Sequence, residues 1–200
     1  MSKAVLISIR PKWVEKIVNG EKTIEVRKTR PKLKTPFKAY IYCTMPDAKD
    51  PHNILELHGA DGKIRKANGK IIGEFTCDRI YEIRKRGIPE NFDYCYLSLN
   101  EWGNDDIETE IRAISASCVS KEELNAYGAK APLLYGWHIS DLLIYDQPRE
   151  LTAFRRACKN SWYCESCAMY WENNGTCGNE SLQIRRPPQS WCYVEAMKDE

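Results

Sequence analysis

The sequence lacks any run of about 18 apolar residues, the length that a membrane-spanning helix needs, so a transmembrane helix is excluded. Its first apolar stretch, Ala4 to Ile9, is too short for a signal peptide and has no small-residue cleavage site behind it. We therefore expect a cytoplasmic protein with no membrane partner, in which thiols stay reduced. Internal repeats and low-complexity segments are absent, and no motif indicates an organic cofactor.

The chain also lacks a large excess of either charge. Its 200 residues carry a net charge of only +2, so it is not a polycation, and 42% apolar with 29% charged residues is typical of a soluble globular protein. The charge is nevertheless uneven, because the only acid between Lys22 and Lys38 is Glu25. The bases of this run are Arg27, Lys28, Arg30, Lys32 and Lys34. The run is suited to a phosphate backbone, although a solvated loop accounts for it equally well.

The basic run begins with a motif, GEKTIEVR, at residues 20–27. Residues 11–19 before it have the pattern of a short helix, and Gly20 suits the left-handed position after a helix end. The period then changes to two, which places Glu25 and Arg27 on one face of a strand and Ile24 and Val26 on the other. We expect either a compact charged site or an ordinary surface ion pair.

Further along the chain the patterns predict mostly short strands. We expect strands at 4–9, 38–44 and 136–145, a pair of strands within 70–83, and a hairpin or long loop at 46–69 with turns at Asp61-Gly62 and Asn68-Gly69. Ser120 and Glu123 form a capping-box pattern that opens a short helix ending at Gly128. These elements predict an α+β fold, a small mixed β-barrel with short flanking helices.

Nine cysteines fall into two groups. Cys43 and Cys77 alternate with apolar residues and are predicted to be core residues. The last part of the chain contains a C-x-x-C pair, Cys164 and Cys167, which with Cys177 and Cys192 gives the four thiolates of one structural zinc ion; Cys158 is an alternative ligand. Buried free thiols, or redox or disulfide pairing, would also account for this second group.

The motif residues Gly20, Lys22, Glu25 and Arg27 match G-x-K-x-x-E-x-R, and the chain therefore resembles the ASCH domain, a relative of the PUA fold. The segments VLISIRPKW, IIGEF and YGWHISDLLIYDQP are similar to those of bacterial and phage ASCH proteins. The resemblance covers residues 1–150, and residues 151–200 form a Cys- and aromatic-rich extension expected to pack on this domain. It implies a PUA-like barrel with a charged cleft that binds RNA or a modified nucleotide.

In that cleft the resemblance places Lys22, Glu25 and Arg27, with Lys28 and Arg30 from the basic run nearby. The candidate stacking platforms for an unpaired base are Trp13, Tyr40, Tyr42 and Trp137, each of which has core packing as the alternative. His138 is a candidate general acid or base, or a structural histidine.

Some small ASCH proteins are amidohydrolases that deacylate acetylcytidine with a lysine, a threonine and a distant glutamate. The lysine corresponds to Lys22, as base or nucleophile, but the threonine position holds Glu25, so catalysis would rest on Lys22 and Glu25. The distant glutamate falls near Glu122 or Glu123. Ribonuclease activity is also reported for the class, although the sequence offers no clear acid–base pair for it. A third possibility is an interaction adaptor that uses the aromatics of the extension.

Overall fold

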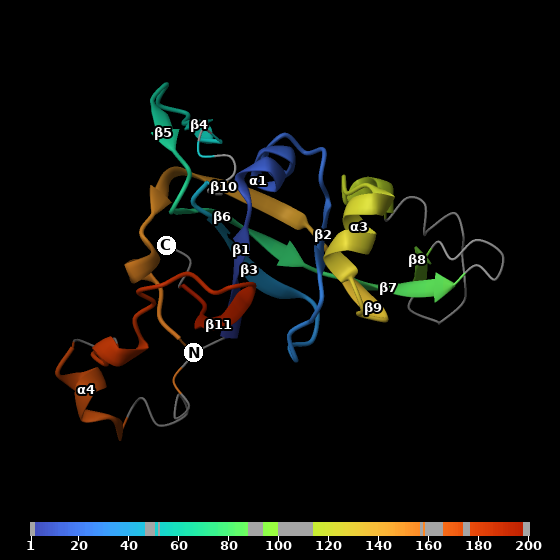
Figure 1. The fold of residues 1–200 in the computed structure, drawn as a ribbon. Coiled ribbons are helices and arrows are strands. Elements are labelled where there is room, and N and C mark those ends of the chain that lie inside the picture. Colours follow the sequence, from blue (N-terminus) through green and yellow to red (C-terminus); the bar gives the residue numbers. More distant parts are fainter. Residues whose placement is uncertain are drawn as a thin grey trace. The chain divides into compact units, whose positions relative to one another are not determined.

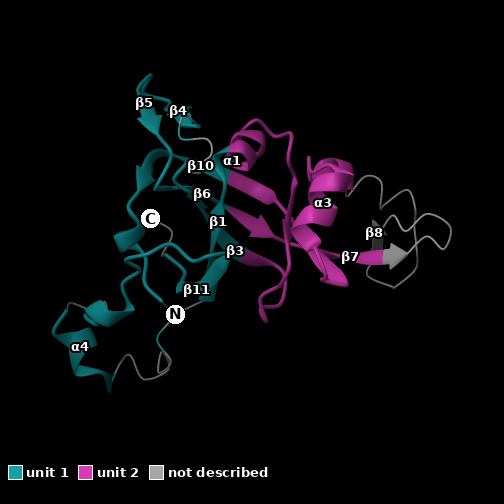
Figure 2. Ribbon diagram, viewed as in Figure 1, with its two compact units in different colours: residues 1–11, 38–74, 143–200 teal, residues 12–37, 75–142 magenta. Residues whose placement is uncertain are grey.

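A computed structural model describes residues 3–46, 51, 53–87, 94–99, 114–156, 158, 166–173 and 177–197. The chain divides into two compact units (Figure 2). Unit 1 comprises residues 1–11, 38–74 and 143–200, and unit 2 comprises residues 12–37 and 75–142. Within the described residues no helix is long and apolar enough to cross a membrane.

Unit 1 is built on a five-stranded sheet with the strand order β10-β6-β3-β1-β11 (Figure 1). Its strands are β1 (Lys3–Ile9), β3 (Phe37–Cys43), β6 (Ile71–Cys77), β10 (Ser140–Arg149) and β11 (Trp191–Glu195). Strand β1 lies inside this sheet and is buried from Ala4 onward, which explains why its sequence is almost continuously apolar. It runs parallel to β3 and antiparallel to β11.

Residues within 151–200, the segment predicted as an extension, complete the core of unit 1. Ile184 and Val194 are buried with Leu6, Tyr40 and Phe154 in one hydrophobic cluster. The register places Leu6 opposite Cys192, so β11 is an integral edge strand of the sheet. The extension thus contributes both a strand and buried apolar surface, which is the main source of folding free energy.

The smaller elements of unit 1 are short. Strands β4 (Glu56–His58) and β5 (Ile64–Lys66) form the hairpin expected within 46–69, and Gly62 supplies the positive φ of its turn. The extension contains the helical turns η1 (Leu151–Ala153), α4 (Ala168–Trp171) and η3 (Glu180–Leu182).

Unit 2 is built on a four-stranded sheet with the strand order β2-β9-β7-β8. Its strands are β2 (Ile24–Arg27), β7 (Ile80–Gly87), β8 (Tyr94–Leu99) and β9 (Leu133–His138). One face packs on α3 (Lys121–Gly128) through a cluster of Val26, Ile83, Leu124 and Leu134. Because side chains alternate along a strand, Glu25 and Arg27 lie on the face of β2 opposite to Val26 and α3.

Both predicted helices are confirmed. The first, α1 (Pro11–Val18), is followed by Gly20 with a φ of 74°. Helix α3 begins with a complete capping box, in which the Ser120 hydroxyl accepts from the Glu123 amide and the Glu123 carboxylate accepts from the Ser120 amide.

The predicted barrel is wrong for the described residues, although the α+β class with mixed sheets and few helices is confirmed. Neither sheet closes on itself, since β10 and β11 end one sheet and β2 and β8 end the other. The strand pair predicted within 70–83 is present as β6 and β7, but the two strands belong to different sheets. Residues 136–145, predicted as one strand, divide between β9 and β10, which also belong to different sheets.

Candidate nucleotide-binding site

Three charged side chains of unit 2 form a connected cluster, here called the triad: Lys22, Glu25 and Arg27. Glu25 lies between the two cations, with Oε1 2.9 Å from Nη2 of Arg27 and Oε2 3.3 Å from Nζ of Lys22. Glu25 and Arg27 are two residues apart on β2 and therefore share a face. One carboxylate thus bridges two cations, which leaves the triad with one net positive charge.

The Lys22 ammonium is held by backbone as well as by Glu25. Its Nζ donates to the carbonyl oxygens of Ile24 at 2.7 Å and Ser117 at 2.6 Å. These acceptors and Glu25 occupy the three donors of the ammonium. The Trp13 ring lies beside it, with Nζ 5.1 Å from the ring centroid. The lysine therefore fastens the segment around Ser117 to the beginning of β2.

Burial distinguishes the triad from an ordinary surface ion pair. The exposed fractions of the side chains are 1% for Lys22, 7% for Glu25 and 10% for Arg27. Burial lowers the pKa of Lys22 because it disfavours the charged ammonium, while the charge and hydrogen bond of Glu25 oppose the shift. Arg27 is the most exposed member of the triad.

The triad lies in the part of the chain that matches the model of a protein family. The model of the ASCH domain family matches residues 7–169, which is more than half of the chain. The chain belongs to the ASCH domain family. Membership suggests RNA binding or a related function and is compatible with a nucleic-acid partner.

Solved ASCH structures are similar over nearly the whole chain. The ASCH protein from Zymomonas mobilis is 16% identical, with 96% of this chain and 87% of that chain covered at a TM-score of 0.47. A point mutant of the Zymomonas mobilis protein is 15% identical, with 97% and 91% covered at a TM-score of 0.48. No curated protein sequence matches this chain.

Strand pairing in the ASCH domain brings aromatic residues beside the triad. The register of β2 and β9 places Glu25 opposite Trp137 and Arg27 opposite Tyr135. Trp137 is completely buried, with its ring edge-to-face on Phe37 at 5.7 Å, so it is a core residue here. Tyr135 is only half-buried, and Arg30 stacks on it with the guanidinium carbon 5.7 Å from the ring centroid.

Sequence reasoning missed two residues of this site. Tyr135 precedes Trp137 by two positions on β9, which begins at Leu133, so the two side chains share a face of the strand. This alternation is the sequence signal that would have identified Tyr135. Ser117 contributes only its carbonyl oxygen, which every residue has, and no sequence signal marks it.

The other predicted cation lies apart from Tyr135. Lys28 is exposed and stacks on Tyr127 of α3, with Nζ 5.2 Å from the ring centroid. Lys28–Tyr127 and Arg30–Tyr135 are thus two of the cation–aromatic pairs of unit 2, and such pairs can meet unpaired bases and phosphates.

Tyr40 and Tyr42 belong to the core of unit 1. Tyr40 is fully buried, packs on Phe154 with ring centroids 4.8 Å apart, and accepts a hydrogen bond from the Met197 amide. Tyr42 is 5% exposed, and burial raises the pKa of its hydroxyl. Their surroundings give both rings a packing role and leave no open ring face for a base.

His138 and Glu123 have structural partners. Nδ1 of His138 lies 2.6 Å from Oδ1 of Asp78; burial would raise the pKa of this carboxyl, but the histidine's hydrogen bond and charge lower it. Glu123 caps α3 and pairs with Lys12 at 2.7 Å, and the hydrogen bond from Lys12 lowers its pKa. His138 lies on the other face of β9 from Trp137, since the two are adjacent along the strand.

The cysteines within residues 151–200 are the predicted zinc ligands. Within the described part of the chain no three His, Cys, Asp or Glu side chains gather as metal ligands, and Cys164 lies outside it. Cys192 packs against the core of unit 1, and burial raises the pKa of its thiol, which disfavours the thiolate that zinc requires. Cys158, Cys167 and Cys177 are free thiols. Cys192 therefore fits the predicted site poorly, and the zinc ion stays a prediction.

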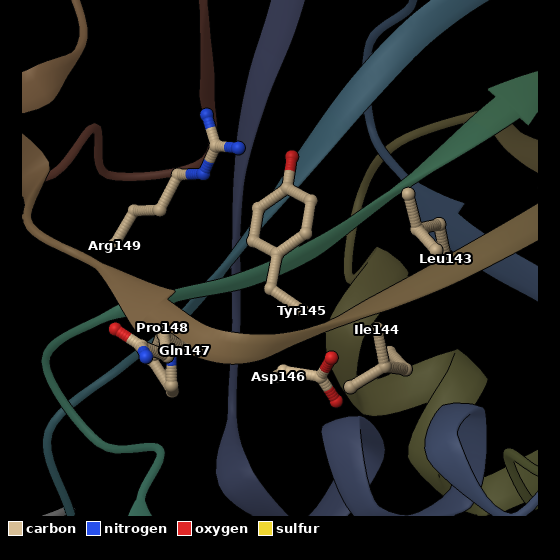
Figure 3. A pocket seen from close by; sticks show the side chains of 7 residues that line it. All are labelled: Leu143, Ile144, Tyr145, Asp146, Gln147, Pro148 and Arg149. Atoms are coloured by element: carbon tan, nitrogen blue, oxygen red, sulfur yellow. The ribbon is translucent and has the colours of Figure 1, made fainter. Parts of the chain in front are cut away.

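A separate groove of about 530 Å³ follows residues 143–149 of unit 1. Tyr145 and Arg149 project from one side of β10, and Ile144 and Asp146 from the other (Figure 3). The Tyr145 hydroxyl donates to Glu74 at 2.5 Å, and Arg149 stacks on the Tyr145 ring at 4.6 Å. These contacts satisfy the polar groups internally, so the groove is a weaker candidate for ligand binding than the surroundings of the triad.

Proposed function

We propose that this ASCH protein binds RNA or a modified nucleotide at unit 2, around Arg27 and Tyr135. One observation carries the proposal: the arginine of a buried Lys–Glu–Arg cluster is paired in the strand register with a half-buried tyrosine of β9. A fixed guanidinium beside an aromatic ring matches a nucleotide, which offers a base to stack and oxygen acceptors to bind.

The charge of the triad supports an anionic or oxygen-rich ligand. Two buried cations share one carboxylate, so a single positive charge is left in surroundings where water screens poorly. A phosphate or a base carbonyl at Arg27 would compensate it. Glu25 holds the guanidinium in one orientation, and a preoriented arginine loses less conformational entropy on binding.

An exposed cation, Arg30, extends the proposed surface and lies over the Tyr135 ring. Its charge would contact a backbone phosphate while Tyr135 contacts a base. Lys28 lies beside Tyr127 of α3 and would contact a more distant phosphate of the same strand. Recognition is favoured over catalysis because the Lys22 ammonium already has three acceptors and its side chain is only 1% exposed.

The test measures binding of a short single-stranded RNA over a range of salt concentrations. Tyr135→Leu should weaken binding about tenfold, because one stacked base contributes about 1–3 kcal/mol. Arg30→Gln should weaken it and reduce the slope of log affinity against log salt by about 0.7, the value for one lost phosphate contact on a single strand.

The matched control is Lys66→Gln, which removes one exposed positive charge from β5 of unit 1. It should leave the affinity for RNA unchanged. Wild-type affinity in both Tyr135→Leu and Arg30→Gln would refute the proposed site, and an equal loss in Lys66→Gln would indicate attraction by overall charge alone.

A second candidate is deacylation of an acylated nucleoside such as acetylcytidine. The lowered pKa of Lys22 favours it, because a lysine acts as base or nucleophile only in its neutral form. The lysine would have to release the carbonyls of Ile24 and Ser117 first. Incubation with acetylcytidine at high protein concentration, followed by chromatography for cytidine, decides it: absence of product eliminates this activity.

A further inference from the structure

We propose that the C-terminal extension contains a second anion site, a pocket in unit 1 in which Arg156, Arg185 and Arg186 bind phosphate groups. The pocket has a volume of about 420 Å³, and its other lining residues are Glu180, Ser181 and Gln183. It shares no residue with the triad. Pockets of this size hold small organic ligands, so a nucleotide or one segment of an RNA strand would fit.

The pocket is carried by two chain segments that are bound to each other. The Arg156 amide donates to the Leu182 carbonyl at 2.7 Å, and the Ile184 amide donates to the Phe154 carbonyl at 2.9 Å. A side-chain bond joins the same segments, from Nε2 of Gln183 to the Thr152 carbonyl at 2.9 Å.

The hydrophobic core anchors this framework. Phe154 and Ile184 are 1% and 3% exposed and belong to the main cluster of unit 1. Arg156 and Arg185 each follow such an anchored segment, so their backbones are fixed before a ligand arrives. Preorganisation of this kind lowers the entropic cost of binding.

The charge of the pocket is strongly one-sided. The described lining contains three arginines and one carboxylate, that of Glu180. The nearest pair, Nη2 of Arg185 and Oε2 of Glu180, is 4.0 Å apart, with side chains 70% and 85% exposed. Such an exposed pair contributes little free energy. The Arg185 guanidinium therefore remains able to bind an external anion.

The residue type indicates phosphate in particular. A guanidinium presents its N–H donors in a planar fork that binds two oxygens of a phosphate at once, and three guanidinium groups match the several oxygens of one or two phosphates. The phosphate belongs either to a free nucleotide or to an RNA strand, since both offer the same oxygens.

The direct test is a calorimetric titration with pyrophosphate at low salt. Arg156→Gln and Arg186→Gln should each reduce the affinity about fivefold to tenfold, as expected for one lost charge-assisted contact. Glu180→Gln should raise the affinity, because it removes the only carboxylate among the described residues of the pocket lining. Arg156→Lys, which keeps the charge but not the fork, should fall between the wild type and Arg156→Gln.

The control is Lys130→Gln, which removes an exposed charge from unit 2. It should leave pyrophosphate binding unchanged. Equal affinity in the wild type and all pocket variants would overturn the proposal, and so would a loss in Lys130→Gln as large as that in Arg156→Gln. Glu180→Gln is expected to bind pyrophosphate more tightly than the wild type. This variant therefore tests the proposal even where an arginine variant fails to fold.

Competition identifies the source of the phosphate. If adenosine monophosphate displaces pyrophosphate as well as a short RNA does, the pocket is a nucleotide site; if only the RNA does so, it is a strand site. Pyrophosphate has no base, so this result is independent of Tyr135 and distinguishes failure here from failure of the proposed function.

Discussion

The carboxylate of Glu25 lies 2.9 Å from the guanidinium of Arg27, and the two side chains are only 7% and 10% exposed. The same carboxylate faces the buried ammonium of Lys22. Removing a charge from such a cluster leaves the others buried without compensation. The motif residues of this protein should therefore affect both its stability and its binding.

Glu25→Gln should lower the free energy of unfolding by about 3 kcal/mol or more, because two buried cations lose their shared counter-charge. Urea denaturation measures the change. The control is Glu82→Gln, which removes the partner of Arg84 from a pair with side chains 32% and 49% exposed. The control substitution should lower the free energy of unfolding by less than about 1 kcal/mol. Similar losses for the two variants would show that the triad contributes no more than a surface pair.

Lys22 should make stability rise with pH on the alkaline side. Burial lowers its pKa in the folded protein below the ordinary value of 10.5, so the folded chain releases this proton at a lower pH than the unfolded chain. Between these two pKa values the unfolded chain binds more protons, and the free energy of unfolding rises with pH. Lys22→Met should remove this contribution.

Urea denaturation of wild type and Lys22→Met from neutral pH to the ordinary lysine pKa tests this. Their difference in unfolding free energy isolates Lys22, because other alkaline groups such as the Cys43 thiol, whose burial raises its pKa to about 12, are common to both proteins. Lys130→Met serves as the control for an exposed lysine. A difference that does not change with pH would contradict the prediction.

Protein purified without added zinc should contain about one zinc ion per chain if the extension holds a structural site. Cys167→Ser and Cys177→Ser should lose the metal. Cys192→Ser should keep it, because Cys192 packs on the core and Cys158 is the better fourth ligand. Less than about half an equivalent in the wild type would argue against a tetrathiolate site.

Local patterns in the sequence predicted the local structure well. Gly20 ends α1, Ser120 and Glu123 cap α3, and the Asp61-Gly62 turn forms a hairpin, because each depends on backbone conformations of a few neighbouring residues. The alternation in GEKTIEVR likewise predicted that Glu25 and Arg27 share a face.

Longer-range features were not predictable in the same way. The division of 136–145 into β9 and β10 depends on which sheet each half joins, and no local pattern records that choice. Tyr40 and Tyr135 show the same limit, since the alternation of polar and apolar residues does not tell which ring lies in a core. The burial of the triad depends on the segment around Ser117, which lies far from Glu25 in the sequence.

The pairing of β1 with β11 has a consequence for synthesis on the ribosome. The hydroxyl of Ser8, on β1, donates a hydrogen bond to the carbonyl of Pro188, which is 180 residues later in the chain. Translation must therefore deliver almost the whole chain before β1 acquires its second neighbour. Until then the nascent β1–β3 pair presents an apolar strand with unpaired amides, the kind of edge that attracts chaperones and other growing chains. Truncation before Trp191 should accordingly yield aggregated protein even though the triad is already synthesised.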